Sequence, residues 1–243
     1  MLNNPERRNA VSLDMWEAIP QVLDDFGADP AIRSVVLTGA GDKAFASGAD
    51  ISQFEKERST PESIAHYDAV GEKAQKRLKE FEKPVIAMIR GYCIGGGLNI
   101  ANLCDLRLAS DDARFGIPAA KMGLGYKAGS MKILVDLVGP AYALEIMITA
   151  RQFSAEEALR MGLVQKVVPV AELEKTTRGY CEMIAANAPL TMRAAKRIIR
   201  EVSAAKYDGE TCAAWVKECF DSEDYREGRR AFMEKRKPVF KGR

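Results

Sequence analysis

The hydrophobic and polar positions along the chain form two kinds of segment. Short apolar runs of strand length lie mainly in the first two thirds of the sequence, bounded by glycine, proline or polar residues. These runs are residues 32–38, 85–89, 106–109, 115–118 and 163–168. From Ala171 onward the pattern is almost wholly helical, with breaks near Pro189, Gly209 and residues 221–224. Strands mixed with helices, followed by helices alone, predict an α/β core and a helical C-terminal module.

Several local signals indicate where the helices begin and end. Ser12 is the expected N-cap of the first helix, and Pro20 predicts a kink or break within it. Ser154 with Glu157 three residues later is typical of a capping box, and Gly162 is placed to end that helix. Three further helices are expected at residues 62–81, 131–138 and 142–148.

Length and charge exclude several classes of function. The chain has 243 residues, which fits one domain with a possible helical appendage. Its 36 Lys and Arg against 34 Asp and Glu give a net charge of only +2, so charge offers no argument for nucleic acid or membrane as a partner. No apolar run is long enough to span a bilayer, and the N-terminus lacks the order of a signal peptide. We therefore expect a soluble, cytoplasmic protein.

Cysteine and histidine usage argues against a metal centre. The five cysteines form no CxxC pair, and their odd number argues against a disulfide framework, so reduced core thiols are expected. His66 is the only histidine and lies in a polar helical stretch, where a solvated side chain is expected. A zinc site rich in histidine and a Ser-His-Asp triad are both disfavoured.

A glycine-rich stretch, residues 91–100, is the first candidate for chemistry. It follows the strand predicted at residues 85–89, and Gly95, Gly96 and Gly97 precede a short buried helix. Residues without a Cβ let a ligand approach the backbone, and the free N–H groups of a new helix favour negative charge. Taken alone this stretch could be a flexible turn. Its position predicts an anion or oxyanion site.

A second loop strengthens this interpretation. The strand predicted at residues 32–38 runs into residues 39–51, which again follow a strand end. Two such loops, each offering one backbone N–H, are the minimum for a two-donor hole around a thioester or ester oxygen. Residues 39–44 also fit a dinucleotide-binding pattern, G-x-G-x-x-A. Residues 45–50 do not continue as an amphipathic helix, however, so we favour the oxyanion reading.

The two loops and several flanking motifs resemble the crotonase (enoyl-CoA hydratase/isomerase) family. The matching segments are residues 4–10, 45–50, 84–87, 91–97, 104–107, 113–116, 154–158, 162–164 and 227–236. They cover almost the whole chain in order. The resemblance implies an α/β fold with a ββα spiral core at residues 1–188 and a helical oligomerisation module at residues 189–243. It also implies a homotrimer or a dimer of trimers. Family members usually carry one or two strands before the segment that matches residues 4–10, so we expect either a trimmed start or a shortened first strand pairing.

The resemblance also implies positions for the substrate. The oxyanion hole would consist of the backbone N–H groups of Ala49 and Gly96. Coenzyme A would enter as part of the acyl-CoA substrate, with no tightly bound cofactor and no metal. The coenzyme A contacts implied are Ala46, Ser47, Gly48, Asp50, Ile51, Phe232 and Lys235. Residues 226–243, with eight Lys or Arg and two Glu, could bind the coenzyme's phosphates or form a solvated helix face.

The chain departs from the family pattern where a hydratase carries two glutamates. By that pattern they fall at Asn99 and Ala119, so both carboxylates are absent. Asn99 can bind water or a ligand through hydrogen bonds but cannot act as a proton base, and Ala119 can do neither. Four acidic residues elsewhere could in principle substitute: Asp50, Asp105, Asp111 and Asp112. Of these, Asp50 and Asp105 belong to motifs that look structural.

Tyr126 is the remaining polar candidate. Residues 122–127 resemble the segment of methylmalonyl-CoA decarboxylase members of the family that carries a pocket tyrosine, although a packed aromatic is the simpler alternative. Decarboxylation generates an enolate without a base, so we expect decarboxylation of a short carboxyacyl-CoA, with Tyr126 and Asn99 orienting the carboxylate. The alternatives are an enoyl-CoA hydratase or isomerase of fatty-acid or related acyl-CoA metabolism, and a CoA-binding protein without turnover.

Overall fold

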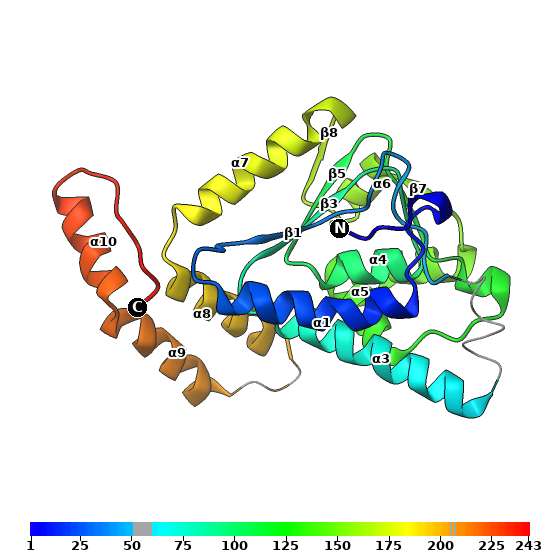
Figure 1. Cartoon of the computed structure of the whole chain (residues 1–243), viewed down its shortest axis with the longest axis horizontal. Helices are drawn as coiled ribbons and strands as arrows, with labels where there is room; N and C mark the ends of the chain where they lie inside the picture. Colours follow the sequence, from blue (N-terminus) through cyan, green and yellow to red (C-terminus); the bar gives the residue numbers. More distant parts are fainter. Residues whose placement is uncertain (51–59, 205, 207) are drawn as a thin grey trace. The chain divides into compact units, whose positions relative to one another are not determined.

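The computed structural model describes residues 1–50, 60–204, 206 and 208–243 (Figure 1). The chain divides into two compact units. The first comprises residues 1–26, 36–80 and 85–177, and the second comprises residues 27–35, 81–84 and 178–243. The expected division at residue 188 into a core and an oligomerisation module stays a prediction.

Two four-stranded sheets form the centre of the first unit. The first sheet has the order β1 (Val35–Leu37), β3 (Val85–Ile89), β5 (Leu106–Ser110), β8 (Lys166–Val168). The second has the order β2 (Ala44–Ala46), β4 (Tyr92–Ile94), β6 (Arg114–Gly116), β7 (Phe153–Ser154). Strands β1 to β6 alternate between the sheets, which is the ββα spiral of the expected crotonase fold. Neighbouring strands are parallel from β3 through β8 and from β2 through β6, and β7 runs antiparallel to β6.

Each of the five predicted runs overlaps a strand, and further short strands were missed. Strands β3 and β5 occupy the expected positions, and β1, β6 and β8 are three residues each, shorter than expected. Strands β2 and β4 were missed because three residues bounded by loop residues show no measurable alternation. The glycine stretch is therefore not a direct turn from β3 to a helix, since β4 lies between them.

The helices of the first unit mostly follow their capping signals. They are α1 (Leu13–Ala28), α3 (Pro61–Glu80), α4 (Gly96–Leu103), α5 (Ala128–Thr149) and α6 (Ala155–Arg160), with 3₁₀ turns at Pro5–Arg7, Pro118–Met122 and Val170–Glu172. The expected break at Pro20 is wrong: α1 continues through it, and Pro20 is buried, so apolar contact offsets the lost hydrogen bond. Helix α5 contains a kink at Gly139 (φ 74°, ψ 166°), which separates the two helices predicted there.

The capping box at the start of α6 is present. The backbone N–H of Ser154 donates to a carboxylate oxygen of Glu157 at 2.8 Å, and the N–H of Glu157 donates to the Ser154 hydroxyl at 3.2 Å. This reciprocal pair satisfies two N–H groups that the helix itself cannot. The helix ends before Gly162, whose φ is +79°.

A buried arginine joins the segment before β5 to the segment before β8. Arg107 on β5 is 2% exposed, and its guanidinium donates to the carbonyl oxygens of Leu163 at 2.6 Å and Cys104 at 2.7 Å. Burial lowers the pKa of this guanidinium, but its donors are paired with carbonyls. Asp105 next to it accepts the backbone N–H of Val85 at 2.8 Å, which fixes the start of β3.

The second unit is built largely from helices. Helix α7 (Leu173–Ala185) leads into it, followed by α8 (Pro189–Val202), α9 (Gly209–Asp221) and α10 (Glu223–Met233) (Figure 1). The breaks between them fall where the sequence predicts them, because Asp208 and Ser222 cap α9 and α10 through their side-chain oxygens. The chain end is held by the Asp224 carboxylate, which accepts the N–H groups of Lys241 at 2.6 Å and Gly242 at 2.8 Å.

Gly97 offers a test of how closely α4 packs on β2. A Cβ at this position would lie 2.3 Å from the carbonyl oxygen of Ala46 and 2.7 Å from its Cβ, so backbone would have to move. We expect Gly97→Ala to lower the free energy of unfolding by about 3 kcal/mol. Gly125→Ala is the control, since its Cβ would meet nothing within 4 Å. Equal urea midpoints for the two variants would contradict this packing.

Candidate functional site

Three parallel strands deliver the predicted site residues to one edge of the second sheet. Strand β4 pairs with β2 on one side and β6 on the other, with Ala46 opposite Cys93 and Ile94 opposite Gly116. Because the strands are parallel, their carboxyl ends lie at the same edge, where loops carry functional groups. The segment after β2 contains Ala49, and the segment after β4 begins α4 at Gly96.

The N-terminal segment holds the first loop in place. The backbone N–H of Val11 donates to the carbonyl of Gly48 at 2.8 Å, and the carbonyl of Val11 accepts the N–H of Asp50 at 3.2 Å. Ala49 lies between these two and pairs with Val11 as an isolated parallel bridge. In an extended segment successive N–H groups point to opposite sides, so the N–H of Ala49 points away from Val11.

Gly96 brings the second N–H to the same place. It is the first residue of α4, after Gly95 (φ 55°), so its N–H has no acceptor within the helix. A Cβ built on Gly96 would lie 3.5 Å from the backbone nitrogen of Ala49. The structure therefore brings together the two backbone groups predicted for the oxyanion hole. The start of a helix adds a favourable field for an anionic oxygen.

Asn99 lies one helical turn further along α4 and is 8% exposed. Its side-chain nitrogen Nδ2 donates to Gln75 Oε1 at 3.2 Å and to the Ser130 hydroxyl oxygen at 3.0 Å. Gln75 belongs to α3 and Ser130 to α5. The sequence analysis missed both residues, because the approach of three helices leaves no local signal. Ala119 is buried in the 3₁₀ turn after β6, so neither family glutamate position carries a polar proton base.

Tyr126 reaches the same loop. Its hydroxyl donates to the carbonyl oxygen of Gly95 at 3.5 Å, which is a weak hydrogen bond. Burial raises the pKa of Tyr126 to about 12. The phenol is therefore protonated at neutral pH and can act as a hydrogen-bond donor beside the two backbone N–H groups.

Lys127, next to Tyr126, links this segment to α3 through ion pairs. Its ammonium lies 2.8 Å from a Glu72 oxygen and 3.0 Å from an Asp68 oxygen, both on α3. Hydrogen bonds to Glu72 and then Asp68 raise the pKa of Lys127, so it stays charged. Exposed pairs of this kind contribute little stability, but they join the Tyr126 segment to the helix that carries Gln75.

Three of the four acidic residues considered as substitutes, Asp50, Asp105 and Asp112, have structural partners. Asp50 accepts a hydrogen bond from the guanidinium of Arg7 at 3.1 Å, and Asp105 anchors β3 as described above. Asp112 accepts from the Ser110 hydroxyl, and Asp111 is exposed at the end of β5. Asp50 and Asp105 thus act in the fold as the motif comparison suggested.

The expected coenzyme A contacts occur in three settings. Ala46 ends β2, and Ser47, Gly48 and Asp50 follow it; the Ser47 hydroxyl donates to the carbonyl of Arg7 at 3.0 Å. Ile51 lies outside the described residues. Phe232 and Lys235 belong to the second unit, where Phe232 is 81% exposed. Their roles toward the coenzyme stay predictions.

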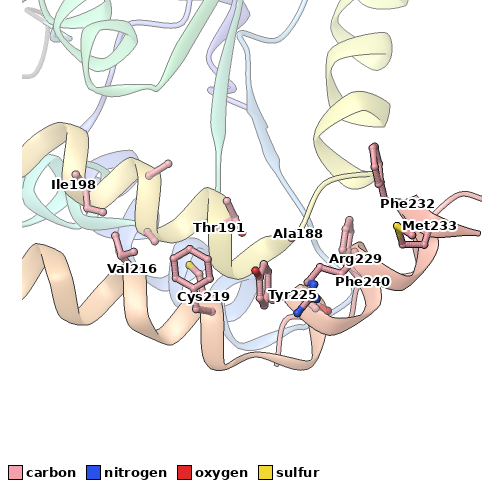
Figure 2. Close-up of a pocket in the computed structure, with 15 residues that line it drawn as sticks. Ala188, Thr191, Ile198, Val216, Cys219, Tyr225, Arg229, Phe232, Met233 and Phe240 are labelled. Carbon is pink, nitrogen blue, oxygen red and sulfur yellow. The ribbon is translucent and has the colours of Figure 1, made fainter. Parts of the chain in front are cut away.

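The second unit contains an apolar groove of about 760 Å³ (Figure 2). Figure 2 shows side chains of α8, α9 and α10 facing it, among them Val216, Tyr225 and Phe232. The groove is lined mainly by carbon, and Ala49, Gly96, Asn99 and Tyr126 are not among its residues. Its size therefore does not make it the catalytic pocket.

Three basic residues of the C-terminal segment, Arg230, Arg236 and Arg243, form ion pairs with acids of α10. Arg236 and then Arg230 donate to the Glu227 carboxylate and hold its pKa well below the usual range. Arg243 lies 3.3 Å from Glu223. These three cations are paired with protein carboxylates, and a role of the segment toward the coenzyme's phosphates stays a prediction.

The described residues contain no group of three or more His, Cys, Asp or Glu side chains that could hold a metal ion. All five cysteines are free thiols; Cys93 and Cys104 lie in the core as expected, whereas Cys181, Cys212 and Cys219 are only half-buried. His66 is exposed. Within the same described ranges, no helix is both long and apolar enough to cross a membrane.

Two interleaved sheets with a helical C-terminal region define the crotonase class of α/β proteins. The chain belongs to the enoyl-CoA hydratase/isomerase family, whose family model matches residues 1–243. It is a crotonase-family enzyme that acts on acyl-CoA thioesters.

Named relatives narrow this class. A short-chain-enoyl-CoA hydratase of Clostridium acetobutylicum is 39% identical over 97% of this chain and 90% of its own. A carnitinyl-CoA dehydratase of Salmonella typhi is 34% identical over 98% of this chain and 92% of its own. A crystal structure of an enoyl-CoA hydratase/carnithine racemase from Magnetospirillum magneticum matches with a TM-score of 0.93 at 38% identity, over 99% of this chain and 90% of the other.

These relatives favour the alternative of the sequence analysis over its leading interpretation. They support a hydratase or dehydratase type of lyase, and they give no specific support to a segment like that of methylmalonyl-CoA decarboxylases.

The pKa of Tyr126 can be tested through stability. Unfolded tyrosine ionises near pH about 10, whereas Tyr126 in the fold does so at about 12. The stabilising contribution is complete below pH 10 and is lost as pH rises. Between pH 9 and 11 we expect wild-type protein to lose about 1 kcal/mol more stability than Tyr126→Phe, measured by urea unfolding. Identical losses would show that the hydroxyl is not buried.

Proposed function

We propose that this protein adds water to short 2-enoyl-CoA thioesters through an enolate held by the backbone N–H groups of Ala49 and Gly96. The observation that carries the proposal is the approach of these two donors at the ends of adjacent parallel strands. When water adds to such a thioester, negative charge develops on the carbonyl oxygen, and fixed donors stabilise it without reorganisation. The name of the Clostridium acetobutylicum relative, short-chain-enoyl-CoA hydratase, supports this choice.

Because positions 99 and 119 carry no carboxylate, another group must transfer the proton. We assign this role to Tyr126. The phenol gives its proton to C2 of the enolate, while the water that adds to C3 gives a proton to the oxygen of Tyr126. One proton leaves the tyrosine and one arrives, so the phenol is restored. A pKa of about 12 makes the transient phenolate a strong base for the second half of this exchange.

Decarboxylation remains a second candidate because one observation favours it. Asn99 and Ala119 leave both glutamate positions without a base, and loss of CO₂ needs none. Against it, both hydrogens of the Asn99 amide already have acceptors in Gln75 and Ser130, which leaves neither for a substrate carboxylate.

We further propose that acyl-CoA is bound with contacts from Phe232 and Lys235, and that the protein forms a homotrimer or a dimer of trimers. Large apolar side chains exposed on α9 and α10 support association: Phe220 is 57% exposed, Phe232 81% and Met233 80%.

The reaction is tested by mass spectrometry of purified protein with equal amounts of crotonyl-CoA, malonyl-CoA and methylmalonyl-CoA. We expect crotonyl-CoA to gain water. Tyr126→Phe should lower kcat by about 10²-fold or more with KM changed little, because only proton transfer is lost. His66→Ala, an exposed change on α3, is the control and should match wild type. Loss of CO₂ from a carboxylated ester would favour decarboxylation. Binding without any turnover would favour a non-catalytic CoA-binding protein.

The oxyanion hole is tested by removing one of its donors. Gly96→Pro lacks the N–H, and proline is tolerated at the first position of a helix. We expect kcat to fall by roughly 10²–10³-fold. Gly96→Ala keeps the N–H, and its methyl group would have ordinary contacts, the nearest at 3.5 Å, so its loss should be much smaller. Equal losses in the two variants, with both folded by circular dichroism, would remove Gly96 from the hole.

A further inference from the structure

The side-chain amide of Asn99 is held with a defined polarity. An amide nitrogen carries two hydrogens, and those of Asn99 Nδ2 are directed to Gln75 Oε1 at 3.2 Å and Ser130 Oγ at 3.0 Å. Both partners are needed to occupy both hydrogens. The amide oxygen Oδ1 is therefore the end of this side chain left to bind something else.

Oδ1 is open to a ligand rather than sealed in the core. Among the described residues it has no hydrogen-bond partner, and it is not among the buried polar atoms that lack one. By contrast, Asn102 Oδ1, one turn along α4, is such a buried atom. Asn99 also donates its backbone N–H to the carbonyl of Gly95, the same oxygen that Tyr126 reaches, so its side chain belongs to this end of α4.

The two partners come from helices that are themselves linked. Gln75 lies on α3 three residues after Glu72, on the same helical face. Glu72 binds Lys127, three residues before Ser130. The ion pair between Glu72 and Lys127 and the amide bridge from Gln75 through Asn99 to Ser130 thus join the same two segments twice. The two hydrogen bonds of Nδ2 oppose rotation of the Asn99 amide, and the ion pair holds Lys127, just before α5, against α3.

We propose that Gln75 and Ser130 are positioning residues that fix Asn99 Oδ1 as a hydrogen-bond acceptor facing the acyl group, and so select esters with a hydroxyl donor at C3 over esters with a carboxylate there. The inference rests on the proposed function, because it requires the acyl group to lie beside the start of α4. It deepens that function by naming the chemistry that the site accepts.

The selectivity follows from charge and hydrogen-bond direction. A hydroxyl or a water molecule can donate a hydrogen bond to the amide oxygen. A carboxylate can only accept, so it would face the partly negative amide oxygen without a hydrogen between them. Leaving a desolvated acceptor facing a carboxylate costs more than a missing hydrogen bond, since the two oxygens repel each other. The same geometry suits both directions of hydration: the incoming water and the 3-hydroxyacyl product each bring a donor.

The experiment measures binding in proteins that all carry Tyr126→Phe, because an active hydratase would interconvert 3-hydroxybutyryl-CoA and crotonyl-CoA during the titration. Wild type in this comparison therefore means unchanged at position 75. Dissociation constants for 3-hydroxybutyryl-CoA and malonyl-CoA are determined by calorimetry, because the two acyl groups have nearly the same shape. Acetoacetyl-CoA, an uncharged ester with an acceptor at C3, separates the effect of hydrogen-bond direction from that of charge. The variants are Gln75→Glu, which can only accept, and Gln75→Lys, which can only donate.

We expect wild type and Gln75→Glu to bind 3-hydroxybutyryl-CoA more tightly than the other two esters. In Gln75→Lys the Asn99 amide must turn its oxygen to the lysine, so preference for the hydroxy ester over acetoacetyl-CoA should fall about tenfold, the scale of one hydrogen bond. Gln75→Met, which neither donates nor accepts strongly, should lie between them and serves if the lysine variant does not fold. The same ratio in every variant would overturn the proposal. Hydroxy-ester preference that shifts as described, when the protein with Tyr126 intact does not hydrate crotonyl-CoA, would uphold it and refute the proposed reaction alone.

Discussion

Parallel pairing of β2 with β4 carries the carboxyl ends of two short strands to one edge of the second sheet. This pairing is what allows two backbone N–H groups, 47 positions apart in the chain at Ala49 and Gly96, to become neighbours. Gly97 keeps the distance small, because only a residue without a side chain lets α4 approach the Ala46 backbone so closely. The site is therefore a consequence of main-chain packing, and its two donors do not depend on side-chain identity at either position.

The N-terminal segment completes this arrangement from the other side. Val11 takes one hydrogen bond from the loop and gives one to it, so the peptide groups on either side of Ala49 are fixed. Asn9 adds a side-chain amide that donates to the carbonyls of Ala40 at 2.9 Å and Ala44 at 2.7 Å. A loop tied at both ends and in the middle loses little entropy when it binds an anion, which is the physical meaning of a preorganised hole.

The sequence contained enough information for the fold class and for the two loops whose backbone groups the structure brings together, but not for the side chains around them. Runs such as residues 85–89 are long enough to show strand character, and Ser154 with Glu157 is a purely local signal. The strands on either side of the hole are three residues long, so pairing with neighbours and not their own pattern defines them. The helix break expected at Pro20 is absent, because burial of the proline ring offsets the hydrogen bond that the helix loses there.

The contacts of Asn99 could not be predicted from the sequence, because its partners Gln75 and Ser130 are 24 and 31 positions away along the chain. Replacing a glutamate by asparagine keeps a planar group of similar polarity on the helix but removes its proton chemistry. Among the described residues, Tyr126 is the ionisable group that reaches this end of α4, and it is a far weaker acid than a carboxyl group.

A weak acid can still protonate an enolate when the acceptor carbon is strongly basic. Two donors to the enolate oxygen reduce that basicity. Stronger binding of the oxyanion therefore makes the enolate easier to form but harder for the phenol to protonate. A carboxylic acid tolerates a very stable enolate, whereas a phenol with a pKa of about 12 requires one that remains more basic. If Tyr126 carries the proton, the rate is limited by its transfer to carbon and not by charge stabilisation. The Asn99 oxygen then matters because it holds water close enough for both transfers to occur in one encounter.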